Sequence, residues 1–179
     1  MKSIIITFLL SAILGFFVST SAKGQAIEQK LTDHVSIRFP AEYKKQDLES
    51  TTLYSLRLAD STANFVAVVS DLLKSNGLDA ATLTAASMSP EFWDQAEQGF
   101  MAQLGPDAKL LGREMKQIAA YDIMQLIIER PVKENNTMNT LTVWIFVDDV
   151  YSLNIAHTNR GGKADENLKK AFFASIAIK

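Results

Sequence analysis

Two segments of the sequence are apolar at nearly every position, and they restrict the fold more than any other feature. Residues 66–69 and residues 123–128 are rich in valine, isoleucine and leucine, and β-branched residues favour strands. A strand with one buried face alternates apolar and polar residues, whereas these segments present apolar side chains to both faces. The sequence therefore predicts a sheet that is covered on both sides.

The other predicted strands follow from alternation and from turn residues. Val35, Ile37 and Phe39 alternate with polar residues, and Pro40 ends their strand because proline cannot donate to a ladder. Turn residues at 60–62 and at 148–150 predict two hairpins. The strands predicted in chain order are residues 35–39, 52–58, 65–69, 109–118 with a bulge at Gly112, 121–130 ended by Pro131, 140–147 and 151–158.

Helices are predicted at residues 78–88, at 90–104 and from about Asp165 onward. The second has the clearest signals, because Ser89 is an N-cap residue, Pro90 occupies the first helical position and Gly105 follows its end. Its apolar face repeats every four residues, at Phe92, Ala96, Phe100 and Leu104. The final helix has Leu168, Phe172 and Ile176 on one face.

This order of elements indicates the fold class. Strands and helices come in separate runs rather than in strict alternation, which is typical of an α+β domain. We expect a mostly antiparallel sheet of about seven strands with helices on both faces, an α/β/α sandwich. No repeat or linker interrupts the chain after its first residues, so residues 27–179 are predicted to form one domain.

Residues 1–26 have the pattern of a cleavable export signal. Lys2 is followed at residues 4–18 by a stretch that is apolar except at three positions, and small residues allow cleavage after Ala22, Gly24 or Ala26. The alternative is an uncleaved anchor, but this stretch is shorter than the roughly 20 residues that span a bilayer. We therefore expect a soluble extracytoplasmic protein, periplasmic or secreted, without a later transmembrane segment.

Composition excludes several classes of function. Lysine and arginine number 18 against 20 acidic residues, a net charge of −2, whereas nucleic-acid binders are usually strongly basic. The chain has no cysteine and two histidines, which excludes disulfides, thiol catalysis and cysteine-ligated metals. We expect no cofactor and no metal site.

Four segments together match the pattern of a known family. They are Val35-Ser36-Ile37-Arg38-Phe39-Pro40, Ala120-Tyr121-Asp122 with the strand to Arg130, the hairpin at Asp148-Asp149, and Phe173-Ala174-Ser175-Ile176. On these segments the chain resembles the PsbP-like and DcrB-like proteins. The resemblance implies an α/β/α sandwich, an extracytoplasmic location and an accessory or assembly role. Because the chain lacks the lipobox cysteine of the lipoprotein members, the resemblance does not imply membrane anchoring.

Two pairs of residues are candidate binding groups. Arg160 and Lys163 flank two glycines before the final helix, where free amides and positive charge favour an anion; the alternative is a plain flexible loop. Phe92 and Trp93, with Phe100 and Met101, are candidates for lining an apolar pocket; the alternative is a packed core stripe.

The remaining chemical groups carry no catalytic motif. No sequence motif places a nucleophile beside His157, so we interpret it as a core or rim histidine. We interpret His34 in the same way. Asp148 and Asp149 fit a turn, with a weak cation site as the alternative. The expected function is a non-catalytic accessory protein of the bacterial envelope that binds another protein. The alternative is a carrier or sensor of a small apolar or anionic ligand, and a hydrolytic enzyme comes third.

Overall fold

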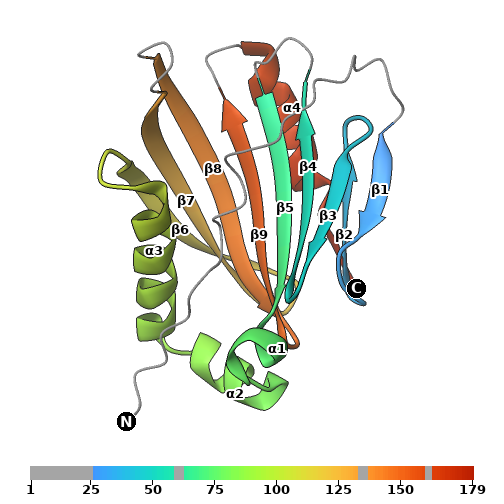
Figure 1. Ribbon diagram of the computed structural model, residues 1–179, viewed down its shortest axis with the longest axis vertical. Helices are drawn as coiled ribbons and strands as arrows, with labels where there is room; N and C mark the ends of the chain where they lie inside the picture. Colours follow the sequence, from blue (N-terminus) through green and yellow to red (C-terminus); the bar gives the residue numbers. More distant parts are fainter. Residues whose placement is uncertain (1–25, 59–62, 133–136, 160–162) are drawn as a thin grey trace.

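The computed structural model describes residues 26–58, 63–132, 137–159 and 163–179. In these ranges the chain forms one antiparallel sheet of seven strands, one of three strands, and four helices (Figure 1). The order across the large sheet is β3 (Lys44–Leu48), β4 (Thr51–Arg57), β5 (Ala63–Asp71), β9 (Tyr151–Asn159), β8 (Thr137–Asp148), β7 (Tyr121–Val132) and β6 (Lys109–Ile118). The predicted α+β class, with an antiparallel sheet covered on both faces, is confirmed.

The centre of the large sheet is buried on both faces. Every residue of β5 except Asp71 is buried, and six consecutive residues of β9 are buried as well. The two strands pair in register from Ala63 opposite Asn159 to Asp71 opposite Tyr151. Because ladder bonds satisfy the backbone within the sheet, stability then depends on covering the side chains on either face.

Three helices contribute to the core cluster on one face of the large sheet. They are α1 (Leu72–Asn76), α2 (Ala80–Ser87) and α3 (Pro90–Leu104). Figure 1 shows α3 along this face and the two shorter helices at the end of the strands. Ser89 caps α3 by accepting a hydrogen bond from the Phe92 N–H at 3.3 Å, as the sequence predicts. Phe92, Ala96 and Phe100 point from α3 into a core cluster with residues of β7 and β8 such as Leu126 and Val143.

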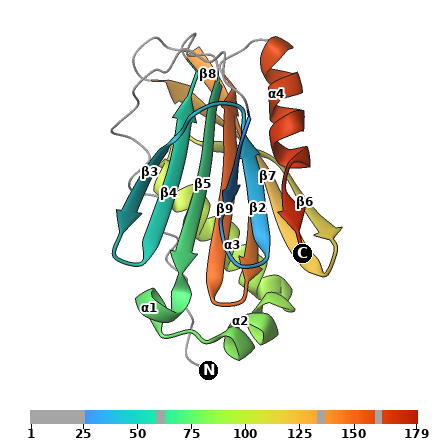
Figure 2. The same cartoon turned by 90° about the vertical axis from the view of Figure 1, so that its right-hand side faces the viewer.

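The small sheet and the last helix cover the opposite face (Figure 2). This small sheet contains β1 (Ile27–Lys30), β2 (Val35–Phe39) and β10 (Ala177–Ile178), and it lies beside α4 (Lys163–Ala174). Phe172 of α4 contacts both sheets. Its ring centroid is 5.5 Å from that of Phe39 in β2 and 5.0 Å from that of Phe65 in β5. The second core cluster is therefore built from a sheet, a helix and a second sheet.

Some predicted boundaries and memberships are wrong. The strand at Val35–Phe39 belongs to the small sheet, and the seventh strand of the large sheet is β3, which alternation did not reveal. β7 continues to Val132 through Pro131, and α4 spans Lys163–Ala174, so Ile176 lies outside it. The irregularity between Leu110 and Gly112 confirms the predicted bulge. The predicted turn at 60–62 lies outside the described residues.

Truncation of Phe172 tests how far this aromatic junction supports the fold. Phe172 is 2% exposed, so Phe172→Ala should lower the free energy of unfolding by about 3–5 kcal/mol, measured by urea denaturation. Lys170→Ala, at an exposed position of the same helix, should change it by less than about 0.5 kcal/mol. Equal midpoints for the two variants would show that α4 is not docked through Phe172.

Candidate functional site

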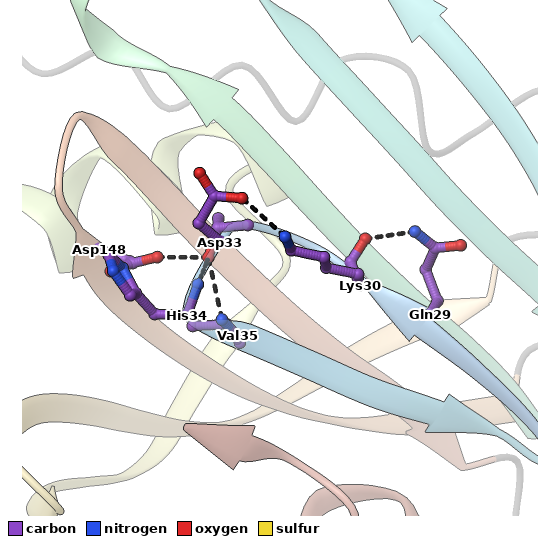
Figure 3. A network of polar contacts seen from close by, with 7 residues as sticks. Gln29, Lys30, Asp33, His34, Val35 and Asp148 are labelled. Carbon is purple, nitrogen blue, oxygen red and sulfur yellow. Dashed lines mark hydrogen bonds and ion pairs between the residues drawn. The ribbon is translucent and has the colours of Figure 1, made fainter. Parts of the chain in front are cut away.

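A buried carboxylate ties the turn between β1 and β2 to the end of β8. Asp148 is 2% exposed, and its Oδ1 lies 3.0 Å from His34 Nδ1 (Figure 3). The Tyr121 hydroxyl donates to the same oxygen at 2.8 Å, and the Thr32 hydroxyl donates to Oδ2. One carboxylate thus accepts from three side chains, which is how a buried charge is tolerated.

The protonation states in this network follow from its partners. Burial, followed by the hydrogen bond to Asp148, raises the pKa of Tyr121 to about 12, so the phenol remains a donor at physiological pH. Because an ionised carboxylate only accepts hydrogen bonds, the proton of a neutral His34 ring is on Nδ1. Nε2 is then the free nitrogen of a side chain that is 51% exposed.

A cleft opens beside this network on the same face of the large sheet. One wall is residues 30–33, the end of β1 with the β1–β2 turn, and the other is residues 47–50, the end of β3 with the β3–β4 turn. The floor consists of side chains of β4, β5 and β9, namely Thr52, Tyr54, Val69 and Tyr151, with Thr51, Asp71 and Lys74 at one end. We call this feature the turn cleft. Its volume of about 570 Å³ lies within the range of about 300–1,000 Å³ of ligand pockets.

The charged side chains of the turn cleft are largely paired with their own neighbours. Lys30 Nζ lies 2.7 Å from Asp33 Oδ1, and Lys74 Nζ lies 3.4 Å from Asp71 Oδ2. The hydrogen bond and charge of Lys30 hold the pKa of Asp33 below its usual value. Hydrogen bonds from Lys45 and Thr52 lower the pKa of Asp47 in the same way. These carboxylates therefore remain charged in neutral and mildly acidic solution.

His157 lies in the core rather than at a surface site. It is 1% exposed, and its ring centroid is 5.0 Å from that of Phe65. Among the described residues, neither ring nitrogen has a hydrogen-bond partner. Burial, with a smaller contribution from the charge of Lys169, lowers the pKa of His157 to about 4, although Glu166 opposes this shift. The ring is neutral at physiological pH.

The aromatic residues that sequence reasoning selected are packed in the core of the α3 face. Phe92 and Trp93 are each 4% exposed, and their ring centroids are 5.0 Å apart in an edge-on contact. The Trp93 Nε1–H donates to the Ser87 carbonyl oxygen at 2.8 Å. Neither residue lines the turn cleft, and the prediction that they hold an apolar ligand stays a prediction.

The predicted anion loop is only partly described. Arg160 lies outside the described residues, and Lys163 begins α4. Asn159, at the end of β9, donates to Glu166 of α4 at 3.4 Å. Contact of Arg160 and Lys163 with an anion therefore stays a prediction.

The sequence analysis missed the two features that define this site. Asp148 and Asp149 were interpreted as turn residues, which holds for Asp149 at φ 54°, whereas Asp148 has its side chain in the buried network. One signal was present: Trp144, Phe146 and Asp148 share a face of their strand, so the alternation predicts that Asp148 is buried with the two rings. Nothing local in the sequence indicates the turn cleft.

Metal and membrane features are limited in the described part of the chain. Within the described ranges, no group of three or more His, Cys, Asp or Glu side chains could hold a metal ion. In the same ranges, no helix is long and apolar enough to cross a bilayer.

Replacing Asp148 tests the buried network. Asp148→Asn removes the charge that three donors share and presents an amide N–H₂ to them. The free energy of unfolding should therefore fall by about 2–3 kcal/mol, measured by urea denaturation at pH 7. Asp149→Asn is the matched control, because asparagine tolerates a positive φ, and it should cost less than about 0.5 kcal/mol. Equal costs for the two variants would contradict a structural role for Asp148.

The buried His157 predicts a pH dependence of stability. Its pKa is about 4 in the folded protein and about 6.5 when unfolded. The unfolded chain therefore binds more protons between these values, and stability is lost as the pH falls through this window. From pH 7.5 to 5 the wild type should lose roughly 2 kcal/mol more than His157→Leu, measured by urea denaturation. Parallel pH profiles for the two proteins would overturn this assignment.

Comparison with known proteins gives similarity of fold. No family model matches the chain, and no curated protein matches it. A solution structure of cyanobacterial PsbP from Synechocystis is 14% identical, with a TM-score of 0.49, and the match covers 90% of this chain and 98% of that one. The predicted resemblance to PsbP-like proteins is thus found again among solved structures.

Two further solved structures are similar at lower scores. LpqN, described as involved in cell envelope biogenesis of Mycobacterium tuberculosis, is 13% identical with a TM-score of 0.40, over 90% of this chain and 88% of that one. A Bacteroides thetaiotaomicron protein is 14% identical with a TM-score of 0.47 over 87% of this chain. The match spans 48% of that longer chain, so this chain is similar to about half of it.

Proposed function

We propose that this chain is a non-catalytic accessory protein of the bacterial cell envelope, which binds a segment of a partner protein in the turn cleft. The observation that carries the proposal is the cleft itself, because it is an open groove of about 570 Å³ with Tyr54, Val69 and Tyr151 on its floor and charged residues at its rim. Protein interfaces have this anatomy, an apolar centre surrounded by polar groups.

The walls of the turn cleft are held in place without a ligand. The Asp71 N–H donates to the Ser50 carbonyl oxygen at 2.7 Å, which fixes the β3–β4 turn against β5. The Leu31 N–H donates to the Val35 carbonyl oxygen at 2.8 Å, and the Thr32 hydroxyl is bound by Asp148. A partner segment does not need to order these walls, so less conformational entropy is lost on binding.

Two further observations support a role without catalysis. His34 has the orienting carboxylate that a general base needs, but in the described residues no hydroxyl is hydrogen-bonded to its Nε2. His157 is neutral and enclosed by the core. A turnover activity that is abolished by His34→Gln would contradict this part of the proposal.

The envelope location rests on the predicted export signal at residues 1–26 and is tested separately. The mature chain recovered from its own cells should begin after Ala22, Gly24 or Ala26, as read by N-terminal mass spectrometry. Recovery of the intact chain from the cytoplasmic fraction would contradict export while leaving the cleft unaffected.

Filling the turn cleft tests the proposed binding. Thr52→Trp places an indole on the cleft floor at a strand position that accepts aromatic residues, and it should abolish co-isolation of the partner from the cell envelope. Gln117→Trp is the matched control at an exposed position of β6, at the far edge of the large sheet, and it should retain the partner. Both variants should show wild-type circular dichroism.

The outcomes of that experiment separate the candidate functions. A partner retained equally by Thr52→Trp and by wild type would overturn the turn cleft as the binding site. Native mass spectrometry of the wild type addresses the alternative, a carrier of a small apolar or anionic molecule. An excess of hundreds of daltons that is lost on denaturation would favour that alternative.

A further inference from the structure

The turn cleft also indicates the chemistry of what it binds. Resting on the proposed function, we infer that the partner segment seated there is basic and places lysine or arginine side chains against the rim of the cleft. The charge balance of the lining, the partners of its lysines and the aromatic floor carry this inference.

The lining has more carboxylates than cations. Asp33, Asp47, Glu49 and Asp71 line the cleft, against Lys30 and Lys74. Each lysine forms an ion pair with a carboxylate three residues away in the chain. An anionic segment would have to compete with those carboxylates for both lysines, and it would meet the other acids as like charges.

The remaining two carboxylates line the other wall, Asp47 at the end of β3 and Glu49 in the β3–β4 turn. Asp47 is bound by Lys45 at 3.0 Å and by Thr52 at 2.9 Å. Among the described residues, no cation lies within ion-pair distance of Glu49. Because Asp47 is paired with Lys45, the excess negative charge of this wall comes from Glu49. Charge complementarity governs both the rate of encounter and the choice of partner.

The floor suits the body of a basic side chain. Tyr54 is 5% exposed and Val69 is 7% exposed, so they form a packed surface beneath the rim. The aliphatic stems of lysine and arginine cover apolar surface of this kind while their charged ends remain at a polar edge. The half-buried Tyr151 lines the cleft beside them.

The experiment uses defined peptides and the whole mature protein. A fluorescein-labelled hexapeptide of alternating arginine and alanine is the probe, and a hexapeptide of alternating glutamate and alanine is its opposite in charge. Fluorescence anisotropy should show binding of the arginine peptide that weakens as salt is raised, because exposed charges are screened. Binding of the glutamate peptide with equal affinity would overturn the inference.

Two double variants, each lacking two negative charges, test whether the arginine peptide binds in the turn cleft. Asp47→Asn with Glu49→Gln should weaken binding of the arginine peptide about fivefold, the combined effect of two exposed ion pairs. Glu91→Gln with Asp107→Asn removes two exposed acids, one in the first turn of α3 and one in the loop after it, and should change the affinity less than about twofold. Equal weakening by both pairs would mean general attraction to an acidic protein and would overturn the inference.

The same variants separate this inference from the proposed function. If Thr52→Trp releases the envelope partner while Asp47→Asn with Glu49→Gln retains it at wild-type level, binding in the cleft stands and the basic partner is wrong. If Thr52→Trp does not release the partner, the proposed function fails first. We expect that Thr52→Trp and the double variant Asp47→Asn with Glu49→Gln both release the envelope partner.

Discussion

Burial of β5 and β9 on both faces is the constraint on which the rest of the structure depends. Residues that face opposite sides of these strands, such as Val68 and Val69 of β5, are equally enclosed, so neither face of the sheet can be left to water. The chain meets this requirement with two unlike layers, helices on one face and a small sheet with α4 on the other. Removing either layer would expose one of the two core clusters, and the two layers therefore stabilise the sheet together.

The turn cleft follows from the size of the second layer. The small sheet has short strands, with four residues in β1 and two in β10, and it cannot cover a face that is seven strands wide in the described chain. Its position is fixed by Phe39 against Phe172 and by Thr32 and His34 on Asp148. Where this layer ends beside β4, Tyr54 and Val69 line the floor of the cleft although both remain buried. The cleft thus lies at the margin of the second layer.

The sequence predicts those parts of the fold that are specified locally. The apolar strands, the capped helix α3 and the bulge at Gly112 were predicted because alternation, capping residues and glycine act within a few positions. β3 escaped prediction since all its residues are exposed, and an edge strand of this kind owes its conformation to pairing with β4. The buried network of Asp148 was not predicted because two of its partners, Thr32 and His34, are 116 and 114 positions away in the chain. No local pattern records such a contact, and the walls of the turn cleft likewise come from segments distant in sequence.

The β1–β2 turn belongs both to the small sheet and to the turn cleft, so the proposed binding there would affect the stability of the small sheet. Thr32 lines the cleft and donates to Asp148, while Asp33 lines the cleft next to His34. A segment that contacts both turns would therefore add interactions to this turn of the small sheet. Any ligand that binds only the folded state stabilises it by mass action. Here the ligand would stabilise the small sheet, which with α4 covers one of the two core clusters. The proposed partner would thus add contacts at the margin of a layer that already buries β5 and β9.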